Sequence, residues 1–178
     1  MDWSAVHLDE TELRLMRTFV DLAPQAGVGT RALAQASRVA LGDSDGWQRC
    51  VPGGPTGILW RISEVSDASM LAPFQTNPAR DMAEVITTRF AQNQHLKPFV
   101  RRVMHYDMLH PVQALARMQR TAKVMFACCA RQPAPGVVAH MALNLVYTAL
   151  VFLWLFDRSA GDATTRAATV TTGRWFRW

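Results

Sequence analysis

The side chains that could take part in acid–base or metal chemistry are scattered along this chain of 178 residues. The five histidines are His7, His95, His105, His110 and His140. The two nearest, His105 and His110, stand five positions apart and therefore face different sides of a helix. The His-Glu-x-x-His arrangement of zinc hydrolases does not occur. We therefore expect no catalytic residues, no metal site, no cofactor and no enzymatic activity.

One glycine-rich segment, Pro52-Gly53-Gly54-Pro55-Thr56-Gly57, precedes a predicted helix and could in principle hold a phosphate with its backbone amides. It lacks the lysine that follows in phosphate-binding loops, and prolines replace amide donors, so we interpret it as a turn. The three cysteines, Cys50, Cys128 and Cys129, form an odd set without metal-ligand spacing. This pattern indicates reduced thiols in a cytosolic protein.

The net charge of +5 directs attention to nucleic acids and anionic membranes as partners. Residues 1–50 carry a net charge of −2, whereas residues 81–130 carry +4 and residues 131–178 carry +3. The first 21 residues include five acids and have no uninterrupted apolar core, so they do not resemble a signal peptide. We expect a cytoplasmic protein that can associate peripherally with the inner face of the membrane.

The spacing of apolar residues predicts an all-α protein. From Asp9, a good N-cap, apolar residues recur every three or four positions as far as Pro24. A second helix is predicted from Thr30 to Gly42, and a short third segment spans residues 44–51. This layout is typical of the helix-turn-helix of TetR-type regulators. The eight residues from Gly42 onward contain two acids and one arginine, which disfavours DNA as a partner.

A polar, proline-bounded break at residues 74–78 divides the predicted helices into two domains. We place a helix-turn-helix-like subdomain at residues 1–75 and a carboxy-terminal helical bundle at residues 76–178. The bundle begins with a helix whose apolar face is Met82, Val85, Ile86 and Phe90. Pro98 and Pro111 each open a further helix, because proline is favoured in the first helical turn.

The most apolar segment is Val137–Phe156, which lies in a stretch of 25 residues without Asp, Glu, Lys or Arg. Such a segment is long enough to cross a membrane. Four polar residues interrupt it: His140, Asn144, Tyr147 and Thr148. They favour a helix that is buried in the bundle or in a homodimer interface. Because a helix of about 30 Å is hard to cover within so small a domain, we expect a homodimer that charge at Leu150 or Trp154 would disrupt.

Several short motifs occur in the order that is found in a known family. The first block contains Gly27, Thr30-Arg31-Ala32-Leu33, Val51-Pro52-Gly53-Gly54-Pro55 and Ser66-Asp67-Ala68-Ser69-Met70. The second contains Val146-Tyr147-Thr148-Ala149, Trp154-Leu155-Phe156-Asp157-Arg158-Ser159 and Thr165, and between the blocks lie Thr88-Arg89-Phe90 and Leu109-His110-Pro111. With these motifs, residues 27–169 resemble the TetR-like lipid-binding accessory proteins of ubiquinone (coenzyme Q) biosynthesis, the Coq-nine type. The chain departs from that family at Val28, where members have tryptophan, and at Arg166, where members often have an aromatic residue.

The resemblance implies a TetR-like helical bundle with a degenerate amino-terminal helix-turn-helix half and a carboxy-terminal bundle for ligand binding and dimerisation. It implies a non-enzymatic protein that binds an isoprenoid lipid or quinone precursor and presents it to quinone-modifying enzymes. Flexible methionine and aromatic side chains suit a long, featureless ligand. We assign lipid binding to Phe99, Met104, Met108, Met118, Met125, Phe126, Met141, Leu145 and Trp154. The alternative is that these residues are ordinary core.

The chain ends in a segment that combines three aromatic residues with two arginines: Gly173-Arg174-Trp175-Phe176-Arg177-Trp178. Tryptophan favours the headgroup region of a bilayer, and arginine is attracted to anionic lipid. We therefore predict membrane contact by Arg174, Trp175, Phe176, Arg177 and Trp178, with a cap folded onto the bundle as the alternative. For the whole protein, the alternative function is that of a TetR-type transcriptional regulator that senses a hydrophobic effector.

Overall fold

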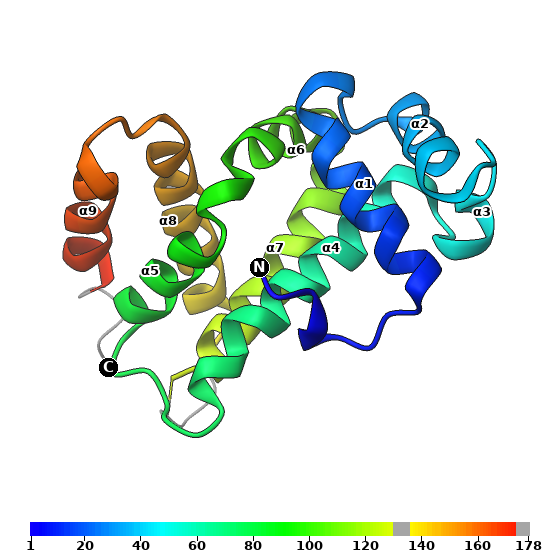
Figure 1. Cartoon of the computed structure of the whole chain (residues 1–178). Coiled ribbons are helices and arrows are strands. Elements are labelled where there is room, and N and C mark those ends of the chain that lie inside the picture. Colours follow the sequence, from blue (N-terminus) through cyan, green and yellow to red (C-terminus); the bar gives the residue numbers. More distant parts are fainter. Residues whose placement is uncertain (130–135, 174–178) are drawn as a thin grey trace. The chain divides into compact units, whose positions relative to one another are not determined.

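The computed structural model describes residues 1–129 and 136–173, and within these residues the protein is all-α, as the sequence predicts (Figure 1). The longer helices are α1 (Glu10–Ala26), α2 (Thr30–Leu41), α4 (Gly54–Leu71), α5 (Met82–Gln92), α6 (Lys97–Leu109), α7 (Pro111–Ala127), α8 (Val137–Phe156) and α9 (Ala163–Gly173). A helix of four residues, α3 (Trp47–Cys50), follows α2. The predicted membrane-contact residues 174–178 lie outside the described part of the chain.

The helices form two compact units. The amino-terminal unit contains residues 2–66 and 95–115, and the carboxy-terminal unit contains residues 67–94 and the chain from residue 116 onward. Because α4 and α7 each extend across a boundary between these ranges, both helices contribute residues to both units.

The division differs from the predicted boundary at residue 75, because α6 folds with the amino-terminal helices. The Phe99 ring of α6 packs edge-on against the Phe19 ring of α1, with 6.3 Å between the ring centres. Nε of Arg102 donates a hydrogen bond to the backbone oxygen of Pro24 at 2.9 Å. These contacts join segments that are about 80 residues apart, a distance over which sequence periodicity carries no information.

Local signals set the ends of the first two helices. The Asp9 side chain accepts a hydrogen bond from the amide of Glu12 at 2.8 Å, as expected of an N-cap. Pro24, where the sequence predicts the end of the helix, lies inside the last turn of α1, and the chain leaves the helix at Gly27. Gly42 ends α2 in the left-handed conformation with φ of 75°, which glycine adopts without strain.

The third helix of the amino-terminal unit is shorter than the predicted segment of residues 44–51. Ser37 in α2 holds the turn before it, since its hydroxyl donates to the Asp43 carbonyl at 2.5 Å and accepts from the Trp47 amide at 3.0 Å. An α3 of only four residues offers little surface to a DNA groove, compared with the recognition helix of a helix-turn-helix protein.

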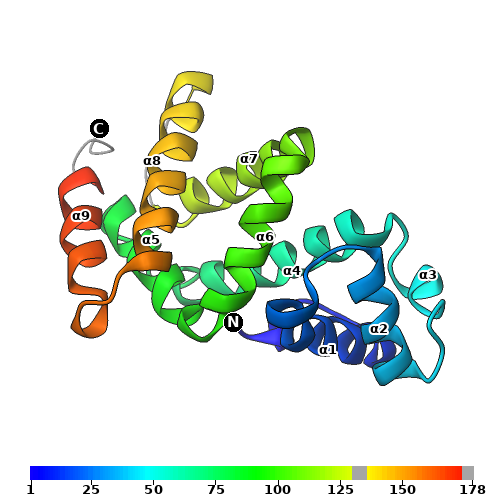
Figure 2. The same cartoon turned by 90° about the horizontal axis from the view of Figure 1, so that it is seen from above.

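In the carboxy-terminal unit, α9 lies beside both α5 and α8 (Figures 1 and 2). Its contact with α5 is close at Gly173, where an added Cβ would come within 2.6 Å of the Cβ of Ala83. Any larger side chain at this position would push α9 away from α5. Gly173 therefore sets the approach of these two helices.

The helix α9 covers residues 164–172, a polar stretch for which the apolar pattern predicts no helix. Several of its threonines satisfy their hydroxyl groups on the helix itself. Thr169 donates to the carbonyl of Thr165 at 2.8 Å, and Thr171 and Thr172 donate to carbonyls four residues earlier at 3.0 and 2.9 Å. The threonines therefore do not need water or a partner helix to bind their hydroxyl groups.

The bounds of α8 are those predicted, but the chain buries only one face of this helix. Its buried residues are Leu143, Asn144, Leu150, Trp154 and Leu155. By length and composition, α8 is the one helix of the described chain that could also cross a membrane. Leu150 and Trp154, where we expect charge to disrupt a homodimer, are 4% and 2% exposed within a single chain. Charge there would disrupt the core of the unit.

Candidate functional site

The predicted lipid-binding residues fall into both units rather than into one cluster. Phe99, Met104 and Met108 lie on α6 in the amino-terminal unit, where Phe99 is buried against Phe19 and Met108 is 66% exposed. The other six lie on α7 and α8 in the carboxy-terminal unit. Phe99 therefore belongs to the core of the amino-terminal unit, and the assignment of Met104 and Met108 to lipid stays a prediction for that unit.

Two contacts place predicted residues of α7 against α8. The Oγ1 of Thr148 lies 3.9 Å from the sulfur of Met118, and the Phe126 ring lies edge-on to His140 with 4.9 Å between the ring centres. Both Met118 and Phe126 are half-buried in this seam between α7 and α8. Met125, by contrast, is fully buried and belongs to the core.

The solvent-facing side of α8 is apolar along its whole length. Its large exposed side chains are between 44% and 80% accessible: Val137, Val138, Met141, Leu145, Phe152 and Phe156. Beyond the adjacent Val137 and Val138, they recur at intervals of three, four or seven residues, as expected of one helical face. We call these six residues the α8 face. The predicted lipid contacts Met141 and Leu145 belong to it, and His140, which contacts Phe126 in the seam, directly precedes Met141.

The opposite side of α8 carries a stack of three aromatic rings. Phe90 of α5 lies between Tyr147 and Trp154, with ring centres 5.9 and 5.1 Å apart and interplanar angles of 14° and 8°. The indole Nε1 of Trp154 donates a hydrogen bond to Oε1 of Gln94 at 3.0 Å. Trp154 is thus fixed on its ring face and at its polar atom, which gives it a structural role beneath the α8 face.

An ion pair is buried beside this stack. The Arg89 guanidinium donates to Oδ1 of Asp67 at 2.6 Å, and the two side chains are 10% and 2% exposed. The Thr121 hydroxyl donates to both carboxylate oxygens, at 3.0 and 3.3 Å. Arg89 also lies 3.6 Å from the sulfur of Met70 and 5.9 Å from the centre of the Tyr147 ring. This buried cluster joins helices α4, α5, α7 and α8 around one charge pair.

Burial and the ion pair have opposite effects on the pKa of the Arg89 guanidinium. Burial disfavours the charged form of Arg89, but interactions with Tyr147 and Asp67 outweigh it and raise the pKa of the guanidinium above its ordinary value. Burial raises the pKa of the Tyr147 phenol, and burial raises the pKa of the Cys128 thiol to about 12. At neutral pH, Tyr147 and Cys128 are therefore protonated, and neither presents a nucleophile.

The sequence motifs of the resemblance account for most of this cluster. Asp67, Met70, Arg89 and Tyr147 all lie in those motifs, and the structure brings them together from positions up to 80 residues apart. Thr121 lies outside the motifs, and a lone threonine on an apolar helix face gives no distinctive sequence pattern. The motif residues that meet here hold helices together, which is a packing role.

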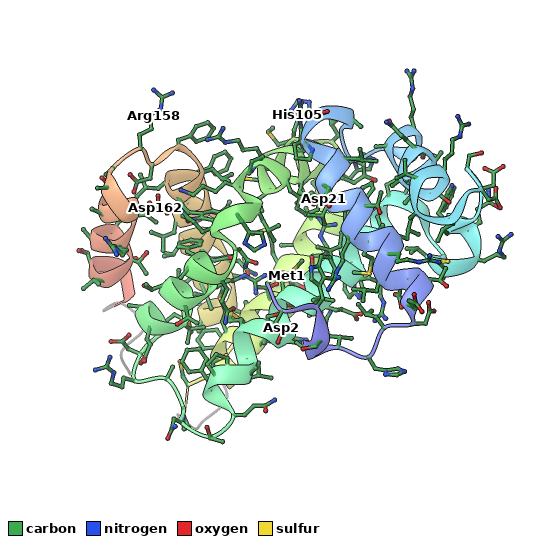
Figure 3. All side chains as sticks on the ribbon, in the orientation of Figure 1. Met1, Asp2, Asp21, His105, Arg158 and Asp162 are labelled. Carbon is green, nitrogen blue, oxygen red and sulfur yellow. The ribbon has the colours of Figure 1, made fainter. Side chains whose placement is uncertain are left out.

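A second group of motif residues connects α8 to α9. Oδ1 of Asp157 accepts from the amide and hydroxyl of Ser159 at 2.9 and 2.6 Å, and Oδ2 accepts from the amide and hydroxyl of Thr165 at 2.7 Å each. These hydrogen bonds, from the Ser159 and Thr165 side chains first, hold the pKa of Asp157 well below its ordinary value. The neighbouring Arg158 side chain points outward from this connection (Figure 3).

The turn between α2 and α3 has the spacing Gly-x-Ser-x-Gly at residues 42–46, which in hydrolases marks a nucleophile. In those enzymes the motif joins a strand to a helix beneath a histidine. Here it joins two helices, and Asp43 stabilises the turn by accepting from the Asp45 amide at 2.9 Å and from Arg49 at 3.2 Å. The context is that of a helix–helix turn.

Groups that suit metal binding do not occur in the described residues. Across residues 1–129 and 136–173, no three His, Cys, Asp or Glu side chains converge around a possible ion position. Cys50, Cys128 and Cys129, all described, form no disulfide. What the described residues do offer is an uncharged α8 face above an apolar seam, and this arrangement can bind apolar molecules by removing both surfaces from water.

Neither the models of known protein families nor the sequences of curated proteins match this chain.

Proposed function

We propose that the protein is a non-enzymatic lipid-binding accessory protein with a TetR-like helical bundle. It binds an isoprenoid or other long apolar lipid on the carboxy-terminal unit and presents it to a quinone-modifying enzyme of ubiquinone biosynthesis. The observation that carries the proposal is the α8 face, six large apolar side chains that no part of the described chain covers. The sequence motifs supply the link to ubiquinone biosynthesis.

Exposure of the α8 face to water is unfavourable in free energy. Covering one large apolar side chain contributes about 1.5–3 kcal/mol, so six of them supply a driving force that few monomeric proteins leave unused. The helix carries no charged residue that would repel a lipid chain. A ligand without hydrogen-bonding groups along its length fits such a surface.

We place the lipid along the amino-terminal half of α8. Met141 and Leu145 lie there at the surface, and the half-buried Met118 and Phe126 line the adjoining seam with α7. Methionine side chains adapt to an irregular ligand because they are unbranched and flexible. Met125 and Trp154 are buried and belong to the core of the same unit.

The carboxy-terminal half of α8 fits a second copy of the chain. Phe152 and Phe156 are 44% and 66% exposed, and they lie one turn apart on the same face. In a twofold dimer the same patch would meet itself, which suits an uncharged surface because no like charges are brought together. The proposed assembly is therefore a homodimer that carries lipid next to its interface.

The lipid proposal is tested by mass spectrometry of lipids that co-purify with the full chain. A double variant, Met141→Gln with Leu145→Gln, removes the apolar surface without touching the buried side of α8. A matched control is Val39→Gln, because Val39 is 66% exposed on α2 in the other unit. We expect a prenyl or other long-chain lipid on the wild type and on the control, and a loss of at least about tenfold in the double variant.

Two outcomes would contradict this function. Wild-type protein that carries no lipid above the level of the double variant would remove the basis of the proposal. Micromolar binding of random duplex DNA at low salt, falling steeply as salt is added, would favour the alternative of a TetR-type regulator.

A further inference from the structure

The corner between α6 and α7 exposes a second set of apolar side chains, which belongs to the amino-terminal unit, whereas the α8 face belongs to the carboxy-terminal unit. Its residues are Met108, Leu109, Val112 and Leu115, which are 66%, 70%, 76% and 51% exposed. We call these four residues the α6–α7 corner. A single residue, His110, separates the last residue of α6 from the first residue of α7. The four side chains therefore lie within a segment of eight residues at a helix–helix turn.

The corner is held in a defined shape. The rings of Tyr106 and His110 stack with 3.9 Å between their centres, and Nδ1 of His110 lies 2.9 Å from the backbone oxygen of Tyr106. The hydroxyl of Tyr106 lies 3.2 Å from Oγ1 of Thr56 on α4. These contacts fix the turn against the rest of the unit, so that the exposed apolar side chains do not result from a loose chain end.

Basic residues precede the apolar ones along α6. Arg101 and His105 are exposed and stand eight and four positions before Leu109, which places all three on one side of the helix (His105 is labelled in Figure 3). Arg102 is also exposed. With a rise of 1.5 Å per residue, Arg101 lies about 12 Å behind Leu109 along the helix axis.

Carboxylates are almost absent from this part of the sequence. Between Glu84 and Asp157, Asp107 is the only acidic residue, whereas eight lysines and arginines occur in the same interval. An apolar tip with cationic side chains behind it, in a strongly basic stretch, matches the layers of an anionic bilayer surface. Hydrocarbon lies deepest in that surface, and phosphates lie above it.

We propose that the α6–α7 corner docks on an anionic lipid surface. Leu109 and Val112 enter the boundary between headgroups and acyl chains, together with Met108 and Leu115. Arg101 and Arg102 then stand at the level of the lipid phosphates, since peripheral segments insert by about 5–10 Å. The occupant is a membrane, because the exposed apolar side chains lie at the turn and the exposed cations Arg101 and Arg102 lie behind them on α6, in the order of the hydrocarbon and phosphate layers of an anionic bilayer.

The experiment is flotation of the full chain with vesicles of phosphatidylcholine, with or without phosphatidylglycerol. The test variant is Leu109→Ser with Val112→Ser, and the matched control is Val39→Ser with Val170→Ser, two exposed valines on other helices. We expect wild type and control to float with the anionic vesicles, and the test variant to lose at least about tenfold in partition. Replacing Arg101→Gln should weaken partition about fivefold at low salt and much less at high salt.

A further variant, Trp175→Ser with Trp178→Ser, separates this site from the predicted membrane contact of residues 174–178. If the α6–α7 corner docks, the corner variant (Leu109→Ser with Val112→Ser) loses binding to vesicles even though Trp175 and Trp178 are intact. Flotation of the corner variant at the wild-type level, or no flotation of wild type, would overturn the proposal. A corner variant that changes the oligomeric state in sedimentation but floats normally would assign the surface to a second copy and also overturn it. Lipid co-purification on α8 is measured separately and does not depend on this result.

Discussion

Asp157 and Thr165 are joined by two hydrogen bonds of 2.7 Å, from the amide and from the hydroxyl of the threonine to the same carboxylate oxygen. Asp157 directly follows α8, and Thr165 lies in the first turn of α9. One carboxylate thus connects the end of the apolar helix to the start of a polar one. It satisfies an amide at a helix start that has no partner within the helix.

This connection predicts a pH-dependent contribution to stability. The folded-state pKa of Asp157 is below its ordinary value of 3.8, so its contribution is fully present above that pH and is lost as the pH falls further. We expect Asp157→Asn to lower the melting temperature at pH 7, with the difference from wild type shrinking below about pH 4. Thermal melts followed by circular dichroism from pH 7 to pH 2.5 measure this difference. An equal difference at every pH would show that the charge has no role.

Because Asp67 and Arg89 form a buried ion pair, we predict that replacing one of them lowers the free energy of unfolding much more than replacing both. Asp67→Ala leaves the guanidinium buried without its carboxylate, and we expect a loss of about 3–5 kcal/mol in the free energy of unfolding. Replacing both charges, as Asp67→Leu with Arg89→Met, should recover much of that loss, because no uncompensated charge is left inside. Denaturation in guanidinium chloride measures both. A double variant as unstable as the sum of the single variants would contradict the interpretation.

The contact of Gly173 with Ala83 predicts that α9 tolerates no side chain at this position. Gly173→Ala places a methyl group within 2.6 Å of the Ala83 Cβ, and we expect it to cost about 1–3 kcal/mol. Adding Ala83→Gly should restore part of the stability, since it removes the opposing methyl group. Gly136→Ala is the matched control, because a Cβ there meets no atom within 4 Å. Equal melting temperatures of Gly173→Ala and this control would rule out the close approach.

The proposed homodimer predicts different effects from the two sides of α8. Phe152→Lys with Phe156→Lys places charge on exposed positions, so it should give a folded monomer. Leu150→Lys places charge in the core of the unit, so it should lower the melting temperature by many degrees whatever the oligomeric state. Sedimentation velocity at micromolar concentration, with circular dichroism as the check on folding, separates these outcomes. A wild-type monomer under these conditions would exclude the dimer.

Short-range signals in the sequence determined most of the helices. The cap at Asp9, the glycine at position 42 and the prolines at positions 98 and 111 act through neighbouring residues, so they predict helix ends within a few positions. The uncharged run predicted the bounds of α8 without error. The polar α9 was missed because its stability comes from Asp157 and from α5, neither of which appears in a local apolar pattern.

Tertiary structure alone decided which predicted residues share a surface. Met125 and Trp154 are buried while Met141 and Leu145 are exposed, although all four are apolar residues on predicted helices. The pairing of Asp67 with Arg89, and the folding of residues 95–115 with the amino-terminal helices, likewise depend on contacts between segments far apart in the chain. The reason is physical: periodicity determines the faces of a helix, whereas burial of a face depends on which other element packs against it.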